Sequence, residues 1–286
     1  MNTSEKQKRV CAIHDISCTG RCSLTVALPI ISAAGFDCAV VPTAVLSTHT
    51  GGFTNFTYTD LTKDIEPISK HWQSLELNFD AIYSGFLGSF KQIDLVGNFF
   101  NNFKTKDNII LVDPVMADNG KLYSIYSYDM VMGMTKLCSK ADIIIPNITE
   151  ACFMVGSIYK KGPYDKPYIE DLLQRLSKLG AKKIVLTGVH FDNESLGTAT
   201  FDTQTGEIEY IFSQYIDGHF HGTGDVFGSA FLSALLSGKS LSEASLVASN
   251  YVVECIQHTI ELSQEARYGV CFERALPFLL KKLDLV

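Results

Sequence analysis

The stretch HGTGDVFGSA, His221–Ala230, is the most informative part of this sequence. Its glycines leave the backbone uncovered just before a run of small and apolar residues, which predicts a buried helix over Gly224–Leu236. In such a helix the amides of Thr223, Gly224 and Asp225 point out of the N-terminus, where unpaired N–H groups and the helix dipole stabilise an anion. The stretch therefore indicates an anion-binding turn, although an ordinary N-cap at Thr223 or Asp225 would give the same pattern.

Two other nucleotide-binding patterns are absent from the chain. No GxxxxGK[ST] P-loop occurs anywhere in the sequence. The stretch is not a dinucleotide fingerprint either, because it lies late in the chain and lacks the full GxGxxG form. A bare GxGD pattern is common, so its meaning depends on the elements around it.

Short apolar runs alternate with amphipathic helical patterns over most of the chain. The predicted strands are Val10–His14, Cys38–Val45, Ala81–Ser84, Ile109–Asp113, Ile143–Pro146 and Ile184–Thr187. The predicted helices, besides the one already named, are Leu61–Leu75, Phe90–Phe103, Tyr128–Cys138, Tyr168–Leu179, Ser242–His258 and Phe272–Lys282. Alternation of this kind predicts an α/β fold whose central sheet is mostly parallel and covered by helices on both faces. Residues 197–212 predict an antiparallel hairpin at the sheet edge. We find no repeat and no linker, and expect a single domain over residues 1–286.

Composition excludes several classes of protein. The 286 residues carry 24 Lys and Arg against 31 Asp and Glu, a net charge of −7, so a nucleic-acid partner is not expected. No signal peptide or membrane span is recognised, and the eight cysteines form no CxxC pair, which favours a reduced, cytoplasmic protein without structural zinc. The pair His219 and His221 lacks a third ligand in the sequence and is interpreted as part of a polar loop.

Polar residues follow almost every predicted strand. They are Asp15, the run Ser47–Gly52, Gly85, Asp113, Asn147 and Thr187. Because ligands of such sheets bind beyond the carboxyl ends of the strands, these residues predict a site at that edge.

These motifs together resemble a known family. Gly222–Asp225 resembles the GTGD signature of the ribokinase-like superfamily, and five further segments narrow the resemblance to the pyridoxal (vitamin B6) kinases. In chain order the segments are Ser47–Gly51 (STHTG), Tyr83–Gly88 (YSGFLG), Asp113–Met116 (DPVM) with Gly120–Tyr123 (GKLY), and Pro146–Ala151 (PNITEA). The match runs from about Val10 to His258. It implies a three-layer α/β/α sandwich, and an ATP-dependent kinase that phosphorylates the 5′-hydroxymethyl group of a B6 vitamer.

The resemblance also implies roles for individual residues. Asp225 would be the general base, and the amides of Gly222, Thr223 and Gly224 would hold the transferred phosphoryl group. Oxygen ligands for Mg²⁺ would come from Asp113 and Glu150. The substrate contacts implied are Asp15, Cys22, Leu46, His49, Thr50 and Phe86. The ATP contacts implied are Asp118, Tyr123, Asn147, Thr187, Thr223 and Asn250. A monovalent cation is a further option, and relatives are commonly homodimers.

Two positions depart from the pyridoxal kinase pattern. Asp15 stands where that family has Ser, and an Asp after the first strand is instead a feature of hydroxymethylpyrimidine kinases of thiamin biosynthesis. Phe86 stands where many pyridoxal kinases have Tyr. Against the thiamin alternative, those relatives usually carry Cys where Asp225 stands. Pyridoxal or pyridoxamine kinase is the first interpretation, hydroxymethylpyrimidine kinase the second and a sugar kinase the third. A nucleotide-binding regulator without turnover is the alternative from another class.

Overall fold

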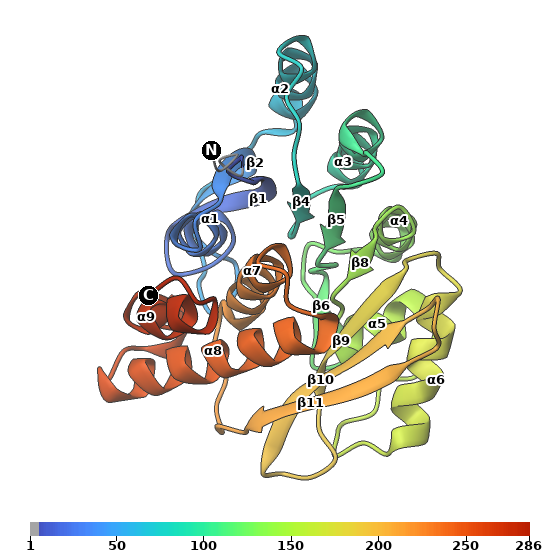
Figure 1. Cartoon of the computed structure of the whole chain (residues 1–286), viewed down its shortest axis with the longest axis vertical. Helices are drawn as coiled ribbons and strands as arrows, with labels where there is room; N and C mark the ends of the chain where they lie inside the picture. Colours follow the sequence, from blue (N-terminus) through green and yellow to red (C-terminus); the bar gives the residue numbers. More distant parts are fainter. Residues whose placement is uncertain (1–5) are drawn as a thin grey trace, which may run out of the picture.

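The computed structural model describes residues 6–286 and is built around a nine-stranded sheet (Figure 1). Its strands, in spatial order, are β11 (Ile208–Gln214), β10 (Ser195–Asp202), β9 (Lys183–Val189), β8 (Ile143–Ile144), β5 (Ile109–Val112), β4 (Ala81–Ser84), β1 (Arg9–Thr19), β2 (Asp37–Thr48) and β3 (Tyr58–Asp60). The six strands from β9 to β2 pair in parallel, while β10 and β11 at one edge and β3 at the other are antiparallel. The predicted α/β class, with a mostly parallel sheet and an antiparallel edge hairpin, is confirmed.

Helices cover both faces of the sheet (Figure 1). One layer contains α1 (Leu24–Ala33), α7 (Thr223–Leu236), α8 (Leu241–Glu261) and α9 (Phe272–Lys282). The other layer contains α2 (Thr62–Ser74), α3 (Phe90–Phe103), α4 (Tyr128–Cys138), α5 (Ile148–Val155) and α6 (Lys166–Ser177). A two-stranded ribbon, β6 (Ala117–Asp118) with β7 (Lys121–Leu122), and the 3₁₀ turn η1 (Ala266–Tyr268) complete the described elements. Among residues 6–286, no helix combines the length and the apolar character needed to cross a membrane.

The apolar strands bury side chains on both faces, which explains their continuous hydrophobic runs. Successive side chains of a strand point to opposite faces, so Val10 of β1 packs under α7 and α8 while Cys11 and Ile13 pack under the helices of the other layer. In β4, Tyr83 and Ile82 divide in the same way. Each face of the sheet therefore has its own hydrophobic core.

Strand β1 is longer than predicted. We expected it to end at His14, but after a register shift between His14 and Ile16 it continues along β2 to Thr19. The extra residue belongs to β2, where Thr43 and Ala44 lie opposite the single residue Asp15 of β1. Asp15 thus lies at the register shift, and it lines the cavity described below.

The connections define where the site lies. The chain leaves β1 for β2 on one side, and later returns to β4 on the other side of β1. In open α/β sheets the point at which the strand order reverses leaves a crevice at the carboxyl ends of the two strands. The ends of β1 and β4 therefore provide the natural ligand site of this fold.

Candidate active site

A cavity of about 590 Å³ opens at the carboxyl edge of the parallel strands. It is lined by residues that follow β1, β2, β4, β5, β8 and β9, by the N-terminus of α7 and by one side of α8. All but one of the site residues implied by the sequence lie in its wall. They are Asp15, Cys22, Leu46, His49, Thr50, Phe86, Asp113, Asp118, Tyr123, Asn147, Glu150, Thr187, Gly222, Thr223, Gly224 and Asp225.

Asn250 is the exception, because it is not among the residues that line the cavity. It lies on α8, but its side-chain oxygen accepts a hydrogen bond of 2.9 Å from the hydroxyl of Ser213 on β11. The α8 residues that do line the cavity are Ser249, Val252, Val253 and Ile256. Asn250 joins α8 to the edge hairpin and is not part of the cavity wall.

The turn before α7 is shaped by Gly222. This residue is the N-cap of α7 and has φ 77°, a left-handed conformation that favours glycine. A Cβ atom there would lie 2.0 Å from the carbonyl oxygen of Arg21. Neither Thr223 nor Asp225 caps the helix, so the ordinary N-cap alternative is wrong. The first amides of α7 have no partner within the helix and are available to an anion.

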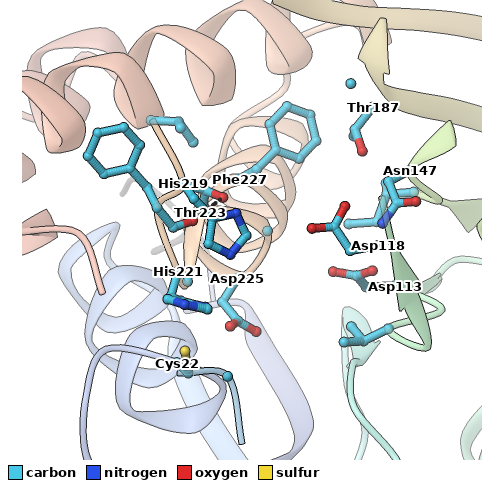
Figure 2. A pocket seen from close by; sticks show the side chains of 18 of the residues that line it. Cys22, Asp113, Asp118, Asn147, Thr187, His219, His221, Thr223, Asp225 and Phe227 are labelled. Atoms are coloured by element: carbon cyan, nitrogen blue, oxygen red, sulfur yellow. Dashed lines mark hydrogen bonds between the residues drawn. The ribbon is translucent and has the colours of Figure 1, made fainter. Parts of the chain in front are cut away.

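Asp225 lies in the first turn of α7, and 16% of its side chain is exposed. Burial raises the pKa of its carboxyl to about 7, with a further rise from the charge of Asp15 and an opposing effect from the amide of Ser23. A carboxylate with a pKa near neutrality is suited to accept a proton from an alcohol. Figure 2 shows Asp225 and Thr223 on one side of the cavity, opposite Asp113, Asp118 and Asn147.

Two further carboxyl groups lie near Asp225. Burial raises the pKa of Asp113 well above its ordinary value, and the charges of Glu150 and Asp225 raise it further. Burial likewise raises the pKa of Glu150, to about 8, although backbone amides oppose this shift. The negative charges of Glu150 and Asp225 therefore both act on Asp113, and a cation beside Asp113 would relieve this repulsion.

Glu150 and Asn147 form a capping box at the start of α5. Asn147 Oδ1 accepts from the Glu150 amide at 2.9 Å, and Glu150 Oε2 accepts from the Asn147 amide at 2.9 Å. Glu150 Oε1 accepts from the Met116 amide at 3.1 Å, and the Asn147 side-chain amide donates to the Ala117 carbonyl at 2.9 Å. Both side chains are thus committed to protein partners and tie the start of α5 to the segment after β5.

The expected magnesium ligands therefore differ in availability. Among residues 6–286 the carboxylate of Asp113 makes no hydrogen bond, whereas both oxygens of Glu150 accept from amides. Within the same range, no three His, Cys, Asp or Glu side chains form a metal-binding group, and this includes the pair His219 and His221. A site with one or two carboxylates is typical of Mg²⁺ that also binds phosphates and water. The carboxylate of Asp113, which is free among the described residues, fits the role of a direct ligand. Glu150 would contribute only indirectly, because its two oxygens hold the backbone amides of Met116 and Asn147 in place.

The β6–β7 ribbon places Asp118 and Tyr123 at the cavity wall. Its turn contains Asn119 at φ 50° and Gly120 at φ 76°, and the Gly120 amide donates to Thr149 Oγ1 at 3.0 Å. Strands of two residues leave no periodic pattern, so this ribbon was not predicted. Thr187 lies at the end of β9, beyond Asn147, on the same side of the cavity as Asp118 (Figure 2).

His49 lines the cavity and makes two hydrogen bonds through its ring nitrogens. Its Nδ1 accepts from the Gly51 amide at 3.2 Å, so Nε2 carries the hydrogen and donates to the Arg267 carbonyl at 2.6 Å. Its ring lies 5.1 Å from that of His221, which in turn lies 4.7 Å from that of His219. Both His219 and His221 line the cavity, whereas the sequence analysis interpreted this pair only as part of a polar loop.

The fold and this site define a kinase of the ribokinase-like superfamily. Residues 27–269 match the profile of the family described as phosphomethylpyrimidine kinase, and the chain belongs to that family. The resemblance to pyridoxal kinases inferred from the motifs is confirmed at this level, because solved pyridoxal kinases have the same architecture.

Known relatives act on two classes of substrate. A pyridoxal kinase from Lactobacillus plantarum is 30% identical, with a TM-score of 0.88 over 97% of this chain and 98% of that one. A candidate phosphomethylpyrimidine kinase from Bacteroides thetaiotaomicron, crystallised with pyridoxal, is 36% identical with a TM-score of 0.91 over 96% of each chain. The hydroxymethylpyrimidine/phosphomethylpyrimidine kinase of Bacillus subtilis is 27% identical over 65% of this chain and 66% of its own length. The match to a bifunctional thiamine biosynthetic enzyme of rice covers only 41% of that protein.

Proposed function

We propose that this protein is an ATP-dependent kinase that phosphorylates the 5′-hydroxymethyl group of a B6 vitamer. The observation that carries this proposal is Asp225, a carboxyl group with a pKa of about 7 placed directly beside the free amides at the N-terminus of α7. Phosphoryl transfer to an alcohol needs a proton acceptor and a group that holds the phosphoryl oxygens, and this turn offers both. Similarity to the Lactobacillus plantarum and Bacteroides thetaiotaomicron structures supports a B6 vitamer as the alcohol.

In the proposed reaction the hydroxyl oxygen of the substrate attacks the γ-phosphorus of ATP, and the bond from that phosphorus to the ADP oxygen breaks. The hydroxyl proton moves to Asp225. The amides that begin α7 hold the oxygens of the transferred group, as an oxyanion hole does. Mg²⁺, when bound, would neutralise phosphate charge, and Asp113 is the side chain that would hold it.

We place the nucleotide between the edge hairpin and α8. Thr187 and Asp118 lie on that side of the cavity and would face the phosphates, while Val252, Val253 and Ile256 of α8 provide an apolar wall suited to a base. The vitamer would then lie near β1 and β2, against Asp15, Leu46, His49 and Phe86. We also propose that residues 1–286 act as one domain and that the enzyme is a homodimer.

A pyrimidine is the second candidate substrate, and Asp15 favours it. Asp15 lines the cavity, 4% of its surface is exposed, and its Oδ1 has no partner among residues 6–286. An ionised carboxylate only accepts hydrogen bonds, so it favours a ligand that presents a donor. The amino group of hydroxymethylpyrimidine is such a donor, and so are the ammonium group of pyridoxamine and a protonated pyridine nitrogen.

One assay separates these possibilities. ADP release coupled to a spectroscopic readout is measured with pyridoxal, pyridoxamine, pyridoxine, hydroxymethylpyrimidine and its phosphate, each over a concentration series. We expect kcat/KM to be highest for a B6 vitamer, and we expect Asp225→Asn to reduce turnover by about 10² or more while ATP binding changes only a few-fold. A higher kcat/KM for the pyrimidine would identify the enzyme as a hydroxymethylpyrimidine kinase of thiamin biosynthesis instead. Absence of turnover with every alcohol, combined with ATP binding, would indicate the non-catalytic regulator.

A further inference from the structure

A histidine that has no hydrogen-bond partner among the described residues lies next to Asp225. His14, the last regular residue of β1 before the bulge, has 0% of its surface exposed. Neither Nδ1 nor Nε2 has a hydrogen-bond partner among residues 6–286. Buried polar atoms are nearly always satisfied in native proteins, so an imidazole with two unsatisfied nitrogens requires an explanation.

The surroundings of this ring direct it toward one group. Burial lowers the pKa of His14 to about 3, so the ring is neutral and has a single N–H to donate. Its Nδ1 lies 3.9 Å from Oδ1 of Asp225. The ring of Tyr83 on β4 packs edge-on against it with centroids 4.4 Å apart, and the hydroxyl of Tyr83 is also without a partner.

Gly85 helps to keep the ring in this place. A Cβ atom at Gly85 would lie 2.4 Å from His14 Nδ1, so a larger residue in this turn would displace the imidazole. Alternate residues of a strand point to the same face of the sheet, so His14 points to the same face as Val10. That face is the one covered by α7. The imidazole is thus confined between Tyr83 and Gly85 at the end of β4 and Asp225 in the first turn of α7.

We propose that His14 is a positioning residue for the general base: its ring N–H donates to Asp225 Oδ1 during the reaction and turns the other carboxylate oxygen toward the substrate hydroxyl. This inference rests on the proposed role of Asp225. A separation of 3.9 Å is about 1 Å longer than a normal N–H···O bond, and catalytic hydrogen bonds commonly shorten when the substrate binds. With one oxygen held by His14, only the other is free to receive the proton.

The test compares two substitutions of similar size. His14→Asn places an amide N–H close to the position of Nδ1, whereas His14→Leu fills the same space without a donor. With ATP and pyridoxal, or with hydroxymethylpyrimidine if the substrate panel selects it, we expect His14→Leu to lower kcat about tenfold or more. The KM values for ATP and for the alcohol should stay within about threefold, and His14→Asn should recover most of the lost kcat.

A double-mutant cycle shows whether His14 acts through Asp225. In the Asp225→Asn background, His14→Leu should cause no further loss, because the group that it positions is already missing. Thr43→Val is the matched control, since Thr43 is also buried with an unpartnered hydroxyl but lies outside the cavity wall. Thermal unfolding of all variants separates loss of positioning from loss of fold.

The outcomes separate the positioning role of His14 from the base role of Asp225. If Asp225→Asn is slow but His14→Leu keeps kcat within twofold, or if His14→Asn is no better than His14→Leu, the inference is wrong and the base assignment stands. Equal fractional losses from His14→Leu in the wild-type and Asp225→Asn backgrounds would also overturn it. Near-normal turnover of Asp225→Asn would instead remove the proposed function of Asp225 itself.

Discussion

Asp225 carries both the proposed chemistry and its pH dependence. A base must be ionised to accept a proton, and burial raises the pKa of this carboxyl to about 7. Below that value the protonated, inactive form dominates. We therefore expect kcat/KM for the alcohol to rise about tenfold per pH unit up to about pH 7 and to level off above it.

The measurement is a pH profile of kcat/KM for the alcohol between pH 5.5 and 9, with stability checked at each pH. A profile that is flat from pH 5.5 to 8.5 would contradict the role of Asp225.

Asp15 is the residue that we expect to decide substrate preference. Burial raises its pKa to about 6, and hydrogen bonds from Ser23 and Ser17 oppose this rise. At pH 8 the carboxylate is ionised and favours a donor-bearing ring, and a charge-assisted contact is worth roughly 1.5–3 kcal/mol. We expect pyridoxamine to have a higher kcat/KM than pyridoxal, and Asp15→Ser to shift the ratio toward pyridoxal by about tenfold.

This preference should weaken below pH 6, where Asp15 becomes protonated and can donate. Competition assays with both vitamers at pH 5.5 and pH 8 measure the ratio directly. The hypothesis fails if Asp15→Ser leaves the ratio unchanged at pH 8.

Among the single elements, the short helix α5 determines which carboxylate of the site is free to bind a ligand. Its capping box commits Glu150 to the amides of Asn147 and Met116, while Asp113 makes no hydrogen bond among residues 6–286. Replacing each carboxylate should therefore have a different effect. We expect Asp113→Ala to raise the Mg²⁺ concentration needed for half-maximal activity, with little loss of stability.

Glu150→Ala should instead lower the free energy of unfolding by about 1–3 kcal/mol, because it leaves two buried amides without their acceptor. Activity at saturating Mg²⁺ would fall as the segment after β5 loosens. Magnesium titrations and urea unfolding of both variants provide the comparison. Identical Mg²⁺ titration curves for Asp113→Ala and the wild type would rule out the metal role of Asp113.

Elements differ in how well the sequence predicts them. The bounds of α3 and α4 could be predicted to the residue, because their apolar periodicity is clear and Ser89 and Ser127 cap their N-termini. The extension of β1 beyond His14 could not, because it depends on a bulge whose partner is the distant strand β2. Residues such as Asp113 and Thr187 could be placed at one edge because parallel strands end together there.

Side-chain partners were the part that sequence could not supply. Whether Asn250 faces the cavity or Ser213, and whether the oxygens of Glu150 are free, depends on packing between elements far apart in the chain. The surroundings of His14 could not be predicted for the same reason, since nothing in the neighbouring sequence indicates that α7 packs over it.

Across the whole molecule, the cavity lies at the carboxyl ends of the strands, and a network of ion pairs around Asp142 lies at their amino ends. Asp142 precedes β8 at the amino end of the strands and binds Lys104, Lys182 and the amide of Ile110. Burial alone would raise the pKa of Asp142, but the hydrogen bonds from the two lysines and the amide outweigh it and lower the pKa. The group therefore stabilises the fold above its unfolded pKa of about 3.9, and this stabilisation disappears as the pH falls through the lower folded value.

We expect Asp142→Asn to lower the free energy of unfolding by roughly 1–3 kcal/mol at pH 7 and by much less near pH 3, with turnover at saturating substrate unchanged. Urea unfolding at both pH values measures this. Asp202→Asn is the control, because its contact with Lys183 is a partly exposed pair at 3.8 Å and such pairs contribute little. An Asp142→Asn protein as stable as the control at pH 7 would show that the network is neutral.

The order of the sheet also has a consequence during protein synthesis. Of the nine strands of the sheet, β1 is translated first, yet it belongs in the interior, where Val10 pairs with Cys38 on one side and Ala81 on the other. The turn that opens α7 and the helix α8 that closes the cavity are translated only after all nine strands. All nine strands are therefore synthesised before Asp225, and a chain that stalls before Gly222 lacks the turn that we propose binds phosphate. Assembly of the cavity therefore has to wait until α7 and α8 have been translated.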